Sequence, residues 1–383
     1  MGTTGAGKTH AADEQMIEGA KAGLTHLVLD IHNTMGKDMI PSDLSDEFES
    51  HANRFDAYAN SIPCHLMQPI DYPDGIKERV FDTAAFQTDV LSNIFRFGVK
   101  QEPTCRKAIK TVISNGEYMS YGYKAIGRAL DKINTEVAAN VKEKIESLLD
   151  HNSFVDGELP LEEGKINIFD LSKYDTHSQI IIAELLLHYI WRRRIAGKIP
   201  PLFICIDEFQ NIGMRRDGIL STILAEGRRF GLSTLLLTQS LKIHFNDAQI
   251  KLLMQSTYKY FFRPSEADLK EIAALIDPHA ITDTILTLHD LKRGEFILCG
   301  PKYLNGNLET DPIKVTPGKT MPTEVITDME LRSNPSEASH KACQDVQCEL
   351  HPKRRLDINK SKLSNPAKTS NDIEGVVESE LRS

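Results

Sequence analysis

Long hydrophobic runs are missing from this sequence, and so are the usual signs of export. The best candidate for a membrane span, residues 180–191, is too short and is interrupted by Glu184 and His188. We expect no signal peptide, because the first residues carry a chemical motif instead of an apolar stretch. No internal repeat is visible. These absences argue against a membrane-spanning helix, a secreted precursor and a repeat protein.

Positive charge is also in deficit. The chain has 45 Lys and Arg residues against 54 Asp and Glu residues, which gives a formal net charge of -9 at pH 7. This balance argues against a protein that coats nucleic acid without specificity, although a motor can still concentrate basic residues in a pore. Hydrophobic residues make up 40% of the 383 positions, enough for the cores of two domains or of one large domain with an insertion and a tail.

Cysteines are few and scattered. Of the six, Cys205 and Cys299 fall inside apolar, strand-like runs. Buried, reduced thiols in a cytoplasmic protein fit this distribution best. From about residue 317, Ser, Asn, Lys, Glu and Pro dominate and periodicity fades, so residues 317–383 are predicted to be a disordered tail.

The tail holds one pattern that matches a metal site. His340, Cys343, Cys348 and His351 follow the spacing H-x2-C-x4-C-x2-H, which suits tetrahedral zinc. No flanking strand or apolar residue supports a folded zinc knuckle. Both alternatives, a zinc site and a tail without metal, stay open.

The strongest positive signal lies at residues 2–9, which match the pattern G-x-x-x-x-G-K-[ST] in full. The segment consists of Gly2, Thr3, Thr4, Gly5, Ala6, Gly7, Lys8 and Thr9. Its glycines allow backbone N–H groups to surround a phosphate, Lys8 can reach the β- and γ-phosphates, and Thr9 can hold Mg²⁺. The helix expected next adds its positive dipole end. A chance glycine-rich arm would not fill every fixed position, so we expect a site for ATP and Mg²⁺ here.

Apolar segments and helical patterns alternate along most of the chain. Strands are expected at 24–31, 165–169, 202–206, 232–238, 258–262 and 295–299. Helices are expected at 9–22, 178–195, 217–230, 247–256 and 265–276. This order predicts an α/β fold with a mostly parallel, doubly wound sheet, formed by residues 1–32 and 153–316. Residues 33–152 are predicted to be a helical insertion.

Polar residues follow two of the expected strands, at the edge where a parallel sheet binds its ligands. Asp207 and Glu208 follow residues 202–206; Asp207 would hold Mg²⁺, and Glu208 would polarise the attacking water as catalytic base. An acidic N-cap of the next helix is the alternative for this pair. Gln239 follows the next strand and would sense the γ-phosphate, although an ordinary polar strand end has the same pattern.

Basic residues gather at two expected helix ends. Arg228 and Arg229 can complement the helix dipole, or they can reach the phosphates of a neighbouring subunit as arginine fingers, and spacing alone does not decide. The run 191–194 (WRRR) is explained by dipole and solvation, with a DNA contact as the alternative.

Five stretches together resemble the HerA/FtsK-type branch of the RecA-like P-loop ATPases, and the HerA-like group is the most similar. They are GTTGAGKT (2–9), LVLDIH (27–32), LFICIDEFQNI (202–212), ILAEGRRFGLSTLLLTQS (223–240) and LKRGEFILCG (291–300). The resemblance covers about residues 1–315. The segment from residue 226 into the next strand is also similar to conjugative type IV secretion ATPases.

The resemblance implies roles for further residues. Asp30 and His32 match the family's Asp-x-His after the second strand, and Asp30 is expected in the nucleotide site. Arg228 matches the arginine that acts on the neighbouring subunit. Arg263 stands where the family often has an arginine after a strand. The carboxylate pair and the glutamine match the family's Walker B motif and sensor.

The resemblance also implies a ring, because the family forms hexamers with ATP sites between subunits and drives DNA through a central pore. The chain is therefore expected to be an ATP-hydrolysing, helicase-like translocase of double-stranded DNA. DNA processing, conjugative transfer and phage defence are the expected settings, with a nuclease or secretion component as a further partner. A nucleotide-dependent assembly or switch subunit and an inactive fragment are the alternatives.

Two departures from the family stand out. The strand expected before residues 2–9 and an upstream β-barrel are absent, so we expect a chain that is N-terminally truncated relative to its relatives and binds ATP weakly. Phe209-Gln210 replaces the commoner Ala-His after the carboxylate pair, which is more typical of conjugative coupling ATPases.

Overall fold

Five strands form a central sheet in the computed structural model, which describes residues 1–212, 218–304, 307–316 and 347–349. Their order is β2-β5-β1-β6-β7, and every pairing between them is parallel. The strands are β1 (His26–Asp30), β2 (Ala52–Asp56), β5 (Ile166–Asp170), β6 (Leu202–Ile206) and β7 (Leu232–Leu236). The predicted parallel α/β fold is confirmed, and apolar runs in the sequence predict every one of these strands except β2.

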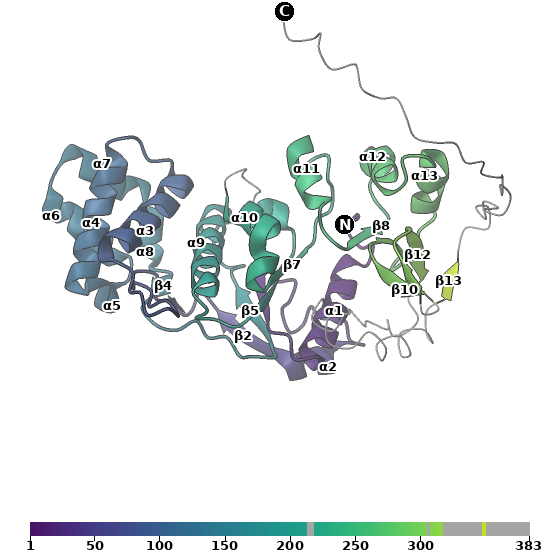
Figure 1. Ribbon diagram of the computed structural model, residues 1–383, viewed down its shortest axis with the longest axis horizontal. Helices are drawn as coiled ribbons and strands as arrows, with labels where there is room; N and C mark the ends of the chain where they lie inside the picture. Colours follow the sequence, from purple (N-terminus) through teal and green to yellow (C-terminus); the bar gives the residue numbers. More distant parts are fainter. Residues whose placement is uncertain (213–217, 305–306, 317–346, 350–383) are drawn as a thin grey trace, which may run out of the picture. The chain divides into compact units, whose positions relative to one another are not determined.

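Helices cover both faces of this sheet, because alternate side chains of a buried strand point to opposite sides. On one face, Val28 of β1 belongs to a cluster with residues of α1 (Lys8–Lys21). On the other face, Leu29 belongs to the cluster that contains residues of α9 (Thr176–Ile195) and α10 (Ile219–Glu226). Figure 1 shows α9 and α10 next to each other, and the two helices are in contact. The sheet is therefore doubly wound, as predicted.

The segment predicted as a helical insertion contributes a strand to the central sheet. β2 follows the short helix α2 (Ser45–His51) and pairs with β5 along its whole length. The predicted start of the insertion at residue 33 therefore falls inside the core, and helix is the wrong prediction for residues 52–56. Their sequence has a single large apolar residue, Phe55, and the edge strand is only half-buried, so no apolar run marks it.

Six α-helices do follow between β2 and β5. They are α3 (Val80–Phe95), α4 (Gln101–Asn115), α5 (Glu117–Tyr121), α6 (Lys124–Ile133), α7 (Glu136–Lys144) and α8 (Glu146–His151). Their buried faces repeat at helical spacing, as in Cys105, Ile109 and Val112 of α4. The parallel pair β3 (Ile62–Pro63) and β4 (Phe154–Val155) joins the two ends of this segment. The helices pack on one another and, through α3 and α8, on α9 (Figure 1).

The last strands form a second sheet that is antiparallel, in contrast to the parallel arrangement expected for them. In the order of the sheet they are β13 (Gln347–Glu349), β12 (Ile313–Thr316), β9 (Phe296–Cys299) and β8 (Lys259–Phe262). The hairpin of β10 (Lys302–Leu304) and β11 (Asn307–Glu309) lies between β9 and β12 in the chain. Such a hairpin returns the chain directly, which makes the strands on either side of it antiparallel.

Three α-helices follow β7 within the described residues, namely α11 (Asp247–Leu253), α12 (Glu266–Ile276) and α13 (Ile281–His289), and of these only α13 was not expected from the sequence. β13 falls inside the segment predicted as a disordered tail, while the rest of that tail lies outside the described residues. The candidate zinc pattern lies there as well, apart from the backbone of Cys348 in β13.

The first three residues lie between the two sheets. The Met1 carbonyl accepts a hydrogen bond from the Phe262 N–H at 2.8 Å, and the Thr3 N–H donates to the Arg263 carbonyl at 2.9 Å. On the other side, the Gly2 N–H lies 3.3 Å from the Thr238 carbonyl, just beyond β7. The loop that follows is therefore anchored to both sheets.

Two expectations drawn from composition can be compared with the structure directly. Cys64, Cys105, Cys205 and Cys299 are buried free thiols, in agreement with the prediction. Within the part of the chain that the structure describes, no helix combines the length and the apolar character needed to cross a membrane.

Candidate nucleotide-binding site

Residues 2–9 form a tight loop that leads into α1. Gly7 caps the helix in a left-handed conformation, with φ 104°, which favours glycine. A Cβ atom there would lie 2.9 Å from Cα of Gly294, so the loop has no room for a side chain. The Gly294 N–H also donates to the Ala6 carbonyl at 2.9 Å. The segment around Gly294 therefore supports the loop from outside, a contact that the sequence motif does not reveal.

The loop has the donors that a phosphate chain requires. Lys8 is 8% exposed, and its Nζ donates to the Thr3 carbonyl at 3.1 Å. The backbone N–H groups of Gly5, Gly7 and Lys8 have no hydrogen-bond acceptor among the described residues. These groups, together with the positive end of α1, fit the negative charge of a nucleoside triphosphate.

Two carboxylates at the end of β6 lie within electrostatic reach of this lysine. Burial lowers the pKa of Lys8, and attraction by Glu208 and Asp207 opposes that shift. Asp207 is itself buried, and burial, followed by repulsion from Glu208, raises the pKa of its carboxyl. The Glu208 N–H donates to Asp207 Oδ1 at 2.9 Å, and the Thr34 side chain is also hydrogen-bonded to Asp207. The structure thus brings the predicted carboxylates to the phosphate loop.

The oxygen atoms beside the loop suit a hard divalent cation. Asp207 offers a carboxylate, and Thr9, the second residue of α1, offers a hydroxyl. No cluster of three His, Cys, Asp or Glu side chains within the described ranges could hold a metal ion by itself. A bound Mg²⁺ would therefore draw its other ligands from phosphate oxygens and water, as this ion usually does. The assignment of Thr9 and Asp207 to Mg²⁺ stays a prediction.

The predicted base and the predicted sensor are in direct contact. Gln239 Nε2 donates to Glu208 Oε1 at 2.6 Å, and Gln210 Nε2 donates to Glu208 Oε2. Glu208 has a left-handed backbone, with φ 51°, which is uncommon for a residue with a side chain. β6 and β7 pair in parallel over five residues each, so their exits bring these side chains together. We predicted roles for Glu208 and Gln239 from the sequence but none for Gln210, which stands only two residues after the predicted base.

The carboxylate of Asp30 is hydrogen-bonded to the turn that follows β1. This carboxylate accepts backbone hydrogen bonds from His32, Thr34 and Met35, and the side chain is 2% exposed. Burial raises the pKa of Asp30, while the bonds from Met35 and Thr34 oppose the shift. Thr34 links this turn to Asp207. The structure therefore places Asp30 near the predicted site in a role that holds the turn, and its contact with nucleotide stays a prediction.

A buried carboxyl on α1 was not predicted. Asp13 lies four residues after Thr9, is 1% exposed, and has no hydrogen-bond partner among the described residues for either carboxylate oxygen. Burial raises the pKa of Asp13 well above its usual range, and repulsion from Asp207 adds to the shift. The available sequence signal is the spacing, because positions i and i+4 share one face of a helix.

The candidate arginine fingers lie at the other end of the strands. Arg228 and Arg229 are exposed on the 3-10 turn that precedes β7. Gln239 follows the opposite end of the same strand, and the five residues of β7 separate these ends by roughly 16 Å. The two arginines therefore lie away from the phosphate loop of their own chain. Arg263 is nearer, because its carbonyl accepts the Thr3 N–H at 2.9 Å.

The three arginines at the end of α9, residues 192–194, contact other residues of the same chain. Arg192 forms an ion pair with Glu78, and its guanidinium lies 4.8 Å from the centroid of the Phe86 ring. Arg193 and Arg194 donate to backbone carbonyls of neighbouring segments. These contacts favour a structural role for the run over the alternative of a DNA contact.

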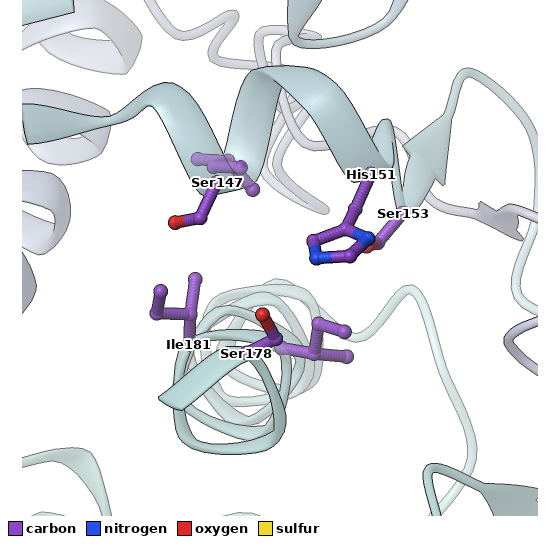
Figure 2. Close-up of a pocket in the computed structure, with 7 residues that line it drawn as sticks. Ser147, His151, Ser153, Ser178 and Ile181 are labelled. Atoms are coloured by element: carbon purple, nitrogen blue, oxygen red, sulfur yellow. The ribbon is translucent and has the colours of Figure 1, made fainter. Parts of the chain in front are cut away.

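A serine–histidine cluster in another part of the chain lines a small cavity. Figure 2 shows Ser147 and His151 on one helix, facing Ser178 on α9. The cavity measures about 10 Å³, which is room for about one water molecule. Ser178 Oγ donates to Asp175 Oδ2 at 2.6 Å, and Asp175 caps the N-terminus of α9. The cluster therefore belongs to a helix cap, and it has no space for a substrate.

Comparisons with known proteins agree with this geometry. The family model described as "Helicase HerA, central domain" matches residues 1–190. VirB4 of Thermoanaerobacter pseudethanolicus is similar in structure, with 14% identity and a TM-score of 0.58 over 78% of this chain and 84% of that chain. The plasmid coupling protein TrwB, in complex with the ATP analogue ADPNP, is similar with 13% identity and a TM-score of 0.55 over 82% of this chain and 83% of that chain. No curated protein sequence matches the chain.

At such low identity, the structural likeness shows the fold alone. The family match shows the family of residues 1–190. The structural likeness agrees with the parallel central sheet, and the family match includes the phosphate loop at residues 2–9. Residues 1–190 therefore belong to the family of the HerA helicase central domain, and the chain has the RecA-like P-loop fold that VirB4 and TrwB share.

Proposed function

We propose that this protein is an ATP-hydrolysing DNA translocase of the HerA type. The observation that carries the proposal is the meeting of Lys8, Glu208 and Gln239 at one edge of the central sheet. A cationic phosphate ligand, a carboxylate base and an amide at one point are the groups that phosphoryl transfer to water requires. TrwB has been solved with ADP and Mg²⁺ and with a GTP analogue, which supports a nucleotide and Mg²⁺ as ligands of this chain too.

Each side chain has a distinct task in this proposal. Lys8 exchanges its present carbonyl partner for oxygens of the β- and γ-phosphates. Mg²⁺, when bound by Thr9 and Asp207, neutralises charge on the phosphates. Glu208 takes the proton of the attacking water, and Gln239 reports the γ-phosphate to Glu208 through their hydrogen bond.

The position of Arg228 and Arg229 supports a ring of identical subunits, with a hexamer as our proposal. They lie at the opposite end of β7 from Gln239, so they cannot complete the site of their own chain. A neighbouring subunit can bring its own exposed arginines to the γ-phosphate, where positive charge stabilises the transition state. Each ATP site then lies between two subunits.

The proposed substrate of the motor is double-stranded DNA that passes through the pore of the ring. The net charge of -9 requires the basic contacts to be concentrated locally, as a pore does. Conjugative transfer, DNA processing and phage defence are the settings in which such a motor works with a secretion component or a nuclease. Phosphate contacts of this kind weaken steeply as salt rises.

Displacement of a third DNA strand from a duplex tests translocation directly. We expect the wild type to displace a triplex-forming oligonucleotide when ATP is present. Glu208→Gln should bind ATP but displace nothing, because it lacks the base. Lys107→Ala, at an exposed lysine of α4, is the control and should behave as the wild type.

The alternative, a nucleotide-dependent switch subunit, predicts a different pattern. A switch would bind ATP and hold its partner in the ATP state, and Glu208→Gln would lock that complex. ATP hydrolysis by the wild type without displacement on any duplex tested would favour the switch and contradict the translocase.

A further inference from the structure

Gln210 contacts Glu208, the proposed base, but has no role in the proposed mechanism of hydrolysis. Its Nε2 donates to Glu208 Oε2, while Gln239 Nε2 donates to Glu208 Oε1 at 2.6 Å. Two amides thus hold the two oxygens of one carboxylate, one from beyond β7 and one from the turn after β6. With one donor on each oxygen, the carboxylate cannot rotate without losing a hydrogen bond.

The turn that carries the second amide is fixed at both ends. It is the 3-10 helix η1 (Phe209–Asn211), and its first residue, Phe209, is 1% exposed. Phe209 stacks on Phe245 with ring centroids 5.0 Å apart. At the other end, Asn211 Nδ2 lies 2.8 Å from His32 Nε2 in the turn after β1. The position of η1 is therefore set by packing and by the neighbouring strand rather than by nucleotide.

The two amides differ in what the proposed reaction asks of them. Gln239 has to respond to the γ-phosphate, and an amide that turns towards a phosphate loosens its hold on Glu208. Gln210 sits on the anchored turn and has no such second task. When Gln239 changes partner, Gln210 is the donor that still directs the Glu208 carboxylate.

Two features of this arrangement destabilise the folded protein. Glu208 has its left-handed backbone, and Gln210 Oε1 is buried without a hydrogen-bond partner among the described residues. Each feature destabilises a fold, and both kinds gather at functional sites.

From these contacts we propose that Gln210 is a positioning residue for ATP hydrolysis. It holds Glu208 in one orientation towards the attacking water while Gln239 engages the γ-phosphate. The inference rests on the proposed function, because it takes Glu208 as the base.

Gln210→Met removes the amide donor at nearly constant side-chain length and tests the proposal. We expect kcat for ATP to fall about ten- to a hundredfold, as when a reacting group is misdirected, with little change in KM and in melting temperature. Gln255→Met makes the same substitution at an exposed glutamine and should keep the wild-type kcat.

A double-mutant cycle separates positioning from a general disturbance. In single-turnover assays, Gln210→Met in the Glu208→Gln background should cost less than about threefold, because the base that Gln210 directs is already gone. A further loss as large as that in the wild-type background would place the effect of Gln210 elsewhere and overturn the inference.

The remaining outcomes distinguish this inference from the proposed function. Wild-type hydrolysis with an unchanged kcat in Gln210→Met overturns the inference and leaves the proposed function standing. A raised KM together with a lowered melting temperature shows a structural role and also overturns it. Failure of the wild type to hydrolyse ATP overturns the proposed function, and the inference with it.

Discussion

The side-chain amide of Gln239 lies 2.6 Å from Glu208 Oε1, so a side-chain hydrogen bond joins the segments that follow β7 and β6. The two strands are paired over five residues each, from Leu202 with Leu232 to Ile206 with Leu236. Because neither strand can slide without breaking that ladder, we propose that the state of the bound phosphates reaches Glu208 through side chains. In this proposal, Gln239 senses the nucleotide, and the anchored turn after β6 orients Glu208.

Gly7→Ala should destabilise the protein and weaken nucleotide binding. The new side chain would have to adopt φ 104° and approach Cα of Gly294 to 2.9 Å, which together cost about 1–3 kcal/mol or more. A displaced phosphate loop should lose at least about tenfold in affinity for ATP. Denaturant unfolding and titration with a fluorescent ATP analogue measure the two effects.

Gly23→Ala is the matched control for that change. Gly23 also has a positive φ, 82°, but a Cβ atom there would meet nothing within 4 Å. It should cost about 1–2 kcal/mol and leave ATP affinity unchanged. Equal affinity in Gly7→Ala and Gly23→Ala would show that the contact with Gly294 does not shape the phosphate loop.

Asp13→Asn should be more stable to unfolding than the wild type, and this advantage should grow as pH rises. Below about pH 4 the Asp13 carboxyl is protonated in the folded and the unfolded chain. Above that pH the unfolded chain releases the proton, whereas burial, which raises the pKa of Asp13, makes the folded chain retain it. The folded state then binds more protons, so the wild type loses stability with rising pH, while the amide stays neutral.

Denaturant midpoints from pH 4 to pH 8, measured without nucleotide, check this prediction. The advantage of Asp13→Asn over the wild type should grow steadily across that range. Asp150→Asn, at an exposed position of α8, should follow the wild-type curve. Parallel curves for Asp13→Asn and the wild type would mean that Asp13 is ionised at no cost in the folded protein.

Mixed assemblies test whether the arginines act between subunits. Lys8→Ala subunits keep their arginines, and Arg228→Ala subunits keep an intact phosphate loop. Each variant alone should be inactive, and mixing them should restore part of the ATPase activity, because a complete site forms at a shared interface. A phosphate-release assay at several mixing ratios of the two variants measures the ATPase activity.

A second mixture serves as the control. Lys8 and Glu208 lie in the same site of one chain, so Lys8→Ala and Glu208→Gln subunits leave no complete site in any arrangement. They should remain inactive at every ratio. Absence of rescue in the first mixture, in assemblies shown to contain both variants, would contradict a role of Arg228 in the neighbouring site.

The sequence allowed most of the central sheet to be predicted, because a strand buried on both faces is a short apolar run. β2 gave no such run, since an edge strand is half-buried and needs only Phe55 to pack against β5. The antiparallel second sheet was missed for another reason. Strand direction depends on the connection, and a short hairpin between strands is hard to distinguish from a crossover by periodicity alone.

Some residues of the candidate site could likewise be predicted from the sequence, and others could not. Lys8, Glu208 and Gln239 were predicted because a motif or a strand end fixes where they must lie. Gln210 and Asp13 were not predicted, because the contacts of a polar residue in a turn or on a helix depend on its tertiary partners. Those partners, a carboxylate oxygen for Gln210 and a buried environment for Asp13, come from distant parts of the chain.

Steady-state release of phosphate from ATP, with and without double-stranded DNA, tests the central claim most directly. We predict that the wild type hydrolyses ATP, that duplex DNA raises its kcat, and that the stimulation declines as salt increases. Glu208→Gln should still bind ATP and lose about a hundredfold or more in rate. A wild type that binds ATP but hydrolyses it no faster than Glu208→Gln, with or without DNA, would contradict the account.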